Sequence, residues 1–175
     1  MRNKFDEQLH SLDEQLTHMG ELCETAIAKA TQALKDGSKE QAKIIITEDE
    51  EIDQIEKDIE RLCLKLLLQQ QPVAKDLRRI SAALKMITDM ERIGDQTSDI
   101  AEIILSSKND VAADDIHVIG TMASEVSKMV RNSVTAYVNR DLELARDVMK
   151  ADDAIDQYFE EVRDEMIDFI KEEKG

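Results

Sequence analysis

Acidic residues with helical spacing form the first group that could do chemistry. Asp49, Asp53, Glu56 and Glu60 follow one another at intervals of four, three and four residues. At about 100° per residue, their side chains span an arc of about 60° on a helix. Carboxylate oxygens are the ligands that hard cations such as Mg²⁺ and Mn²⁺ prefer, and they also bind iron. This spacing alone fits either a cation site or a solvent-exposed acidic face.

A second acidic group continues an apolar helix face. The apolar face is made by Leu77, Ile80, Leu84 and Ile87. The next positions on this face or beside it are Glu91, Asp95, Asp99 and Glu102. Like charges four residues apart destabilise a helix, and burial adds a larger cost unless a cation lies nearby. A bound metal ion would supply that cation, whereas a rotation of the apolar face after Met90 would leave the acids in solvent.

The sequence contains no familiar catalytic constellation. A ferritin-like di-iron site needs two Glu-x-x-His elements and two further glutamates, and the chain offers only Glu7-x-x-His10. It has no phosphate-binding glycine-lysine loop, no serine-nucleophile elbow and no His-Glu-x-x-His motif. We therefore expect a protein that is not an enzyme. A ferritin-like carboxylate metalloenzyme and a metal-free helical scaffold remain the alternatives.

The elements that carry these acids are expected to be helices throughout. The chain has 175 residues, a formal net charge of −16, 42% hydrophobic residues, 5 glycines and 1 proline. The acidic excess argues against nucleic-acid binding, and the scarcity of turn residues argues against a strand-rich fold. Apolar spacing predicts five long helices over residues 4–36, 38–70, 73–105, 114–138 and 141–173. We expect an all-α protein with free, buried thiols at Cys23 and Cys63.

An internal repeat organises the five helices. A shift of 103 residues places the first two helices on the last two without a gap, and it brings the helix-capping Ser38 onto Asp141. The third helix of the first unit would then correspond to a helix starting at Gly175. We predict a first three-helix bundle over residues 1–107 and a second, partial repeat of two helices over residues 108–175.

Several runs resemble the PhoU family: VAKDLR at 73–78, DMERIGD at 89–95, QQPV at 70–73, the Asp49–Asp53 element, and Phe5-Asp6 with Met19-Gly20. The resemblance implies tandem three-helix bundles, the second one incomplete here. It also implies a cytoplasmic negative regulator of phosphate uptake and phosphate-starvation signalling. Such regulators act as adaptors between the ATPase subunit of a phosphate ABC transporter and a sensor histidine kinase, and they often form homodimers.

The resemblance also implies a divalent or multinuclear metal centre containing Fe, Zn, Mn or Mg. Its expected ligands are Asp49, Asp53, Glu91 and Asp95, with Asp99 and Glu102 secondary. Asp152 and Asp156 form a possible half-site, because the partner motif would lie on the missing sixth helix.

An apolar groove is expected to stay uncovered between the last two helices, and the chain is expected to self-associate through it. Its residues are Val134, Val138, Leu144, Val148, Ile155, Phe159, Val162 and Met166. Arg78 and Arg79 are candidates for an anchor to a partner protein, although a surface ion pair with Asp76 is the simpler expectation.

Overall fold

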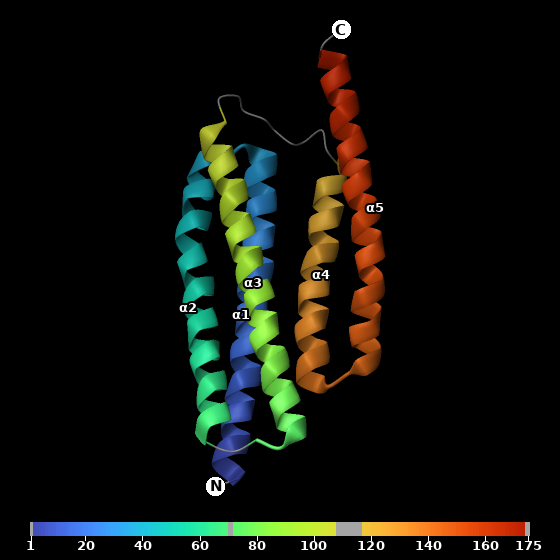
Figure 1. Ribbon diagram of the computed structural model, residues 1–175. Helices are drawn as coiled ribbons and strands as arrows, with labels where there is room; N and C mark the ends of the chain where they lie inside the picture. The colour runs from blue at the N-terminus through green and yellow to red at the C-terminus, as the bar shows by residue number, and fades with distance from the viewer. Residues whose placement is uncertain (1, 70–71, 108–116, 174–175) are drawn as a thin grey trace.

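The computed structural model describes residues 2–69, 72–107 and 117–173. Within these ranges every regular element is a helix, as the sequence predicts (Figure 1). The helices are α1 (Arg2–Asp36), α2 (Lys39–Gln69), α3 (Ala74–Ser106), α4 (His117–Asn139) and α5 (Leu142–Glu173). The predicted start of the fourth helix, residues 114–116, lies outside the described residues. No helix in the described ranges combines the length and apolar character needed to cross a membrane.

The first three helices form a bundle whose core is made of their apolar stripes. Fully buried side chains from all three helices meet there: Leu12, Leu16, Met19, Ile59, Leu66, Ile80 and Ile87. Cys23 and Cys63 are free and buried, as predicted. Burial raises the pKa of Cys23 to about 12 and that of Cys63 to about 11, so both thiols are held in the protonated, unreactive form.

The fourth helix packs directly on the first. A Cβ atom added at Gly20 of α1 would lie 3.0 Å from Cγ2 of Val134, so the glycine permits a close approach of the two helices. Val134 and Val130 belong to the same buried cluster as the α1 side chains, and Val138 packs against that cluster. The expectation that Val134 lines an open groove is therefore wrong, because α1 covers it, whereas Val138 is half-buried.

The fifth helix packs along α4 and makes no comparable contact with another described helix (Figure 1). The remaining residues of the expected groove are only partly covered. Leu144, Val148, Ile155 and Val162 are half-buried. Phe159 and Met166 are exposed.

The internal repeat is visible in the two tight turns. Gly37 and Arg140 are equivalent under the repeat, and both have positive φ, at 61° and 57°. The next residue caps the following helix in both turns: the N–H of Gln41 donates to Ser38 Oγ at 3.3 Å, and the N–H of Leu144 donates to Asp141 Oδ1 at 2.9 Å. Both helix starts predicted from these caps are confirmed.

Candidate metal site

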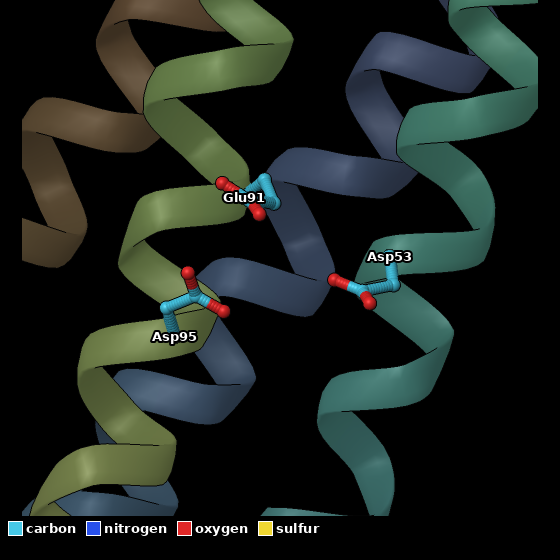
Figure 2. A group of neighbouring side chains, drawn as sticks. All are labelled: Asp53, Glu91 and Asp95. Carbon is cyan, nitrogen blue, oxygen red and sulfur yellow. The ribbon is translucent and has the colours of Figure 1, made fainter.

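Three carboxylates from two helices converge on the face between α2 and α3. Asp53 of α2 and Glu91 and Asp95 of α3 each present one oxygen, and these oxygens lie within 4.8 Å of one another (Figure 2). Two oxygens on opposite sides of a divalent ion, each about 2.0–2.4 Å from it, lie about 4–5 Å apart. The three side chains can therefore hold a cation after small adjustments.

A glycine lets the two helices approach closely at this point. Gly94 is buried, and a Cβ atom built there would lie 2.6 Å from Asp49 Oδ1 and 3.1 Å from Cδ1 of Ile52. Any larger residue would push α3 away from α2 or displace the Asp49 carboxylate. The close approach of the acidic side chains therefore depends on Gly94, a small residue that lies between Glu91 and Asp95 in the sequence.

The carboxylate of Asp49 extends the cluster inward. Its Oδ1 atom is buried and has no hydrogen-bond partner. Burial raises the pKa of Asp49, and the neighbouring charges of Asp95, Asp53 and Asp99 raise it further. An unpaired buried oxygen next to other carboxylates lowers the stability of the fold, and a bound cation would offset that free-energy cost.

The pKa of Glu91 is raised by the same two causes. Burial raises its pKa first, and the charges of Asp95, Glu56, Asp53 and Asp49 add to the effect. Each of these raised pKa values reflects burial first and, in addition, the negative charge of neighbouring acids.

Cations of the chain give the cluster little compensation. Among the described residues, Lys57 forms an exposed ion pair with Asp53 at 3.7 Å. Arg92 is turned toward Asp89 at 3.9 Å and away from the cluster, as its helical position predicts. The donor set thus consists of hard oxygen ligands carrying excess negative charge, which fits a divalent cation.

The structure gathers part of the expected ligand set. It brings Asp53, Glu91 and Asp95 together and places Asp49 beside them. Asp99 is exposed and acts on Asp49 through its charge, while Glu102 is exposed and lies outside the group of three. The predicted half-site, Asp152 and Asp156, is exposed on α5. Within the described part of the chain, these two residues do not form a group with a third acid.

Glu56 belongs to the surroundings of the site, although we did not predict it as a site residue. Burial raises its pKa, and the charges of Glu60 and Asp53 raise it further. It also raises the pKa of Glu91 across the gap between the helices. In the sequence, the helical spacing of Glu56 from Asp49 and Asp53 places it on the same arc of α2. That spacing was the feature that could have identified it as part of the site.

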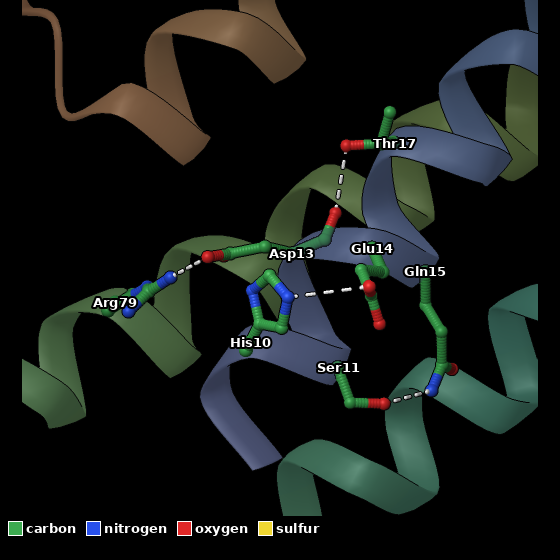
Figure 3. Close-up of polar contacts among 7 residues, drawn as sticks. All are labelled: His10, Ser11, Asp13, Glu14, Gln15, Thr17 and Arg79. Atoms are coloured by element: carbon green, nitrogen blue, oxygen red, sulfur yellow. Dashed lines mark hydrogen bonds and ion pairs between the residues drawn. The ribbon is translucent and has the colours of Figure 1, made fainter. Parts of the chain in front are cut away.

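The remaining polar candidates have structural partners. His10 is exposed and pairs with Glu14 at 3.4 Å, and it is not part of the acid cluster (Figure 3). Arg79 forms a half-buried ion pair with Asp13 of α1, so the expected pairing with Asp76 is wrong for this residue (Figure 3). The reason is tertiary, because α1 lies against α3 at this position.

Known proteins resemble the chain over nearly its whole length. The model of the PhoU domain matches residues 16–104 and 119–175. A "Phosphate-specific transport system accessory protein PhoU homolog" from Clostridium acetobutylicum is 35% identical over 175 residues, which cover 99% of this chain and 80% of the relative. A protein of the same name from Aquifex aeolicus is 34% identical, with 97% and 77% covered.

Solved structures agree with this relationship. The crystal structure of PhoU from Pseudomonas aeruginosa superposes with a TM-score of 0.82 at 29% identity, covering 96% of this chain and 81% of that one. The phosphate transport system regulatory protein PhoU from Streptococcus pneumoniae superposes with a TM-score of 0.85 at 30% identity, with 96% and 79% covered. The chain therefore belongs to the PhoU domain family.

Proposed function

We propose that this chain is a cytoplasmic, non-enzymatic regulator of phosphate transport that represses phosphate uptake and phosphate-starvation signalling. Its family membership supports the proposal, as do relatives named as accessory proteins of a phosphate-specific transport system. In this role it would connect the ATPase subunit of a phosphate ABC transporter with a sensor histidine kinase.

The acid cluster between α2 and α3 is the observation that carries the metal-binding part of the proposal. Asp53, Glu91 and Asp95 would hold a divalent ion, and Asp49 would supply a further buried oxygen. Fe, Zn, Mn and Mg are the candidate metals, and the all-oxygen donor set favours the harder ions. A bound cation would neutralise the α2–α3 face and offer the positive charge that an approaching phosphate needs.

Metal content tests this site directly. The purified chain is dialysed against Mg²⁺, Mn²⁺, Fe²⁺ and Zn²⁺ in turn, and retained metal is measured by mass spectrometry. We expect Glu91→Ala/Asp95→Ala to lose the metal without unfolding, because the change removes repulsion as well as ligands. The matched control is Glu160→Ala/Asp164→Ala, an exposed pair with the same spacing on α5. Equal metal content in the two double variants would contradict the assignment.

The acidic surface would support the adaptor role. A net charge of −16 attracts basic patches on a partner and speeds their encounter. We expect the association rate with the transporter ATPase subunit to fall when NaCl is raised from about 50 mM to about 500 mM, because salt screens exposed charges. An association rate that does not change with salt would count against electrostatic steering.

The regulatory role has a test of its own. In a host that lacks its own regulator of this family, expression of the chain should repress phosphate-starvation genes in phosphate-rich medium. Expression that stays high while the chain is folded and abundant would contradict the regulatory part of the proposal.

A further inference from the structure

The ends of all five helices meet at one end of the molecule, which we call the basal end. It comprises residues 4–13 of α1, 61–68 of α2, 72–86 at the start of α3, and 131–151, which span the turn from α4 to α5 (Figure 1). These stretches contain eleven basic and seven acidic residues, whereas the whole chain has a net charge of −16. The basal end is therefore positively charged, and the acidic excess lies in the rest of the molecule.

Several cations of the basal end are not neutralised by the chain itself. Arg61, Arg79 and Lys150 have ion-pair partners. Four other exposed cations have no partner within 4.0 Å among the described residues: Lys65, Lys75, Arg78 and Arg140. They come from α2, α3 and the α4–α5 turn, so three parts of the fold share one positive surface.

The same end exposes large apolar side chains. Six of them are between 47% and 83% exposed: Leu64, Leu68, Val73, Leu77, Leu142 and Met149. Single exposed apolar residues are normal on a protein surface, whereas a group of them marks a site of contact with a membrane or another protein. The basal end therefore combines positive charge with apolar surface.

A groove brings these two properties together. It has a volume of ≈ 740 Å³ and lies between the start of α3, the end of α4 and the start of α5. Its apolar lining includes Met86, Leu142, Val148 and Met149. Three of the cations without partners line it as well: Lys75, Arg78 and Arg140. The negative charges of Asp76 and Asp141 on the lining offset only part of this positive charge.

The two hydroxyl groups on the lining of the groove already donate hydrogen bonds. Ser133 donates to the backbone oxygen of Met129 at 2.8 Å, and Tyr137 donates to that of Arg79 at 3.0 Å. A ligand that buried several polar groups here would find few partners for them, which is unfavourable. The groove therefore suits an aliphatic chain below an anionic group, and an anionic phospholipid has this chemistry.

We propose that the basal end docks on a bilayer that contains anionic phospholipids. The four unpaired cations meet the head groups, and Leu68, Val73 and Leu142 enter the interfacial layer. The groove receives the head group and the first part of the chains of one lipid. Anionic lipids make the cytoplasmic face of a membrane negative, so this contact rests on the proposed cytoplasmic location. It involves neither the metal site nor a partner protein.

The acidic remainder of the chain does not prevent this contact. Salt screens exposed charges over about 8 Å at physiological ionic strength. Helix α1 has 35 residues and is therefore about 52 Å long. Along α3, Glu91 lies about 25 Å from Ala74 by the same helical rise. A bilayer that touches the basal end is thus several screening lengths away from most of the acidic residues.

Vesicle binding tests the contact. The metal-free chain, in the presence of a chelator, is mixed with vesicles of phosphatidylcholine alone or with about 30% phosphatidylglycerol, and bound protein is measured by sedimentation. We expect binding to the anionic vesicles to be at least about tenfold tighter in about 100 mM NaCl, and to weaken as salt is raised.

A charge reversal locates the contact. Lys75→Glu/Arg78→Glu should lower the affinity about 30-fold or more, because each cation near an anionic membrane contributes about fivefold. Both side chains are exposed at the start of α3, where acidic residues are favourable, so the fold should be kept. The matched control is Lys43→Glu/Arg163→Glu, two exposed cations outside the basal end. Each pair of reversals changes the net charge from −16 to −20.

Leu142→Ser tests whether apolar side chains enter the bilayer. It should weaken binding about tenfold, because a leucine side chain no longer leaves water. Ile103→Ser near the end of α3 is the control, since Ile103 is 65% exposed and Leu142 is 63% exposed.

Three results would overturn the proposal. The first is the absence of any preference for the anionic vesicles. The second is equal affinity of the two charge-reversal variants, because binding would then not depend on the basal end. The third is equal affinity of Leu142→Ser and Ile103→Ser, which would leave the basal end to an acidic protein instead of a bilayer. The chelator removes metal from every sample, and no phosphate-dependent step is measured, so failure here is distinguishable from failure of the metal site or of the regulatory function.

Discussion

The carboxyl groups of Asp49, Glu56 and Glu91 have raised pKa values because each is partly buried among other acids. The folded, metal-free protein therefore binds protons more tightly at these groups than the unfolded chain does. Stability from this source is fully present below the ordinary carboxyl pKa values of about 4, and it is lost as pH rises through the raised values. A cation would replace the proton and remove this pH dependence.

We accordingly expect metal-free protein to unfold at lower urea concentration at about pH 7.5 than at about pH 4. Asp49→Asn/Glu91→Gln should reduce the difference, because the amides do not titrate. The measurement is urea denaturation in the presence of a chelator, followed by circular dichroism. An equal pH dependence in the variant and the wild type would show that these two groups are not its source.

Gly94→Ala tests the close approach of α2 and α3. The added methyl group would lie 2.6 Å from Asp49 Oδ1. Overpacking costs about 1–3 kcal/mol, which we expect to exceed the gain of up to about 1 kcal/mol in helix propensity. We therefore predict a lower free energy of unfolding and less bound metal. Ser98→Ala, on the same helix, is the control, and similar stability in both variants would contradict the tight contact.

At the scale of the helices, a polar contact joins α1, α3 and α4. Asp13 and Arg79 form an ion pair with side chains that are only 15% and 13% exposed. The hydroxyl group of Tyr137 donates to the backbone oxygen of Arg79 at 3.0 Å, and the guanidinium group lies 5.9 Å from the tyrosine ring centroid. The contact fixes the end of α4 against the start of α3.

Removal of one member of the Asp13–Arg79 ion pair should therefore lower the free energy of unfolding. We predict that Asp13→Ala lowers the free energy of unfolding by about 2–4 kcal/mol, because Arg79 is left half-buried without its counter-charge. Asp58→Ala breaks the exposed Asp58–Arg61 pair, with side chains 47% and 70% exposed, and should cost less than about 1 kcal/mol. Urea denaturation of the two variants gives the comparison. Equal losses would mean that burial does not distinguish the two pairs.

At the scale of the whole molecule, the dominant property is a net charge of −16. Self-repulsion at this charge destabilises the compact state, and salt screens it. We predict that the Tm of the metal-free protein rises between about 20 mM and about 500 mM NaCl. For a chain of this size, each kcal/mol of relieved repulsion raises Tm by about 2–4 °C.

A charge-reduced variant provides the check. Glu40→Lys/Glu50→Lys changes two exposed positions on α2 and adds two charges at each, so the net charge goes from −16 to −12. Its Tm should depend less on salt than that of the wild type. The same slope in both proteins would assign the effect to something other than net charge.

The sequence by itself determined the five helices, their caps and the two acidic stripes. Helix formation and capping depend on apolar spacing and on the turn residues at 37–38 and 140–141, which are interactions within one or two helical turns. The structure confirms the helices and the caps. Helical spacing also places Glu91 and Asp95 on one side of α3, because that relationship depends only on the period of the helix.

Only the tertiary structure decided which helices meet and in what register. It brings Asp53 to Glu91 and Asp95, adds Glu56 to their surroundings, and leaves Glu102 outside the group. It likewise pairs Arg79 with Asp13 and covers Val134 with α1. These contacts depend on the rotation and offset of one helix against another. Side-chain packing over the whole bundle sets that geometry, and no local pattern in the sequence encodes it.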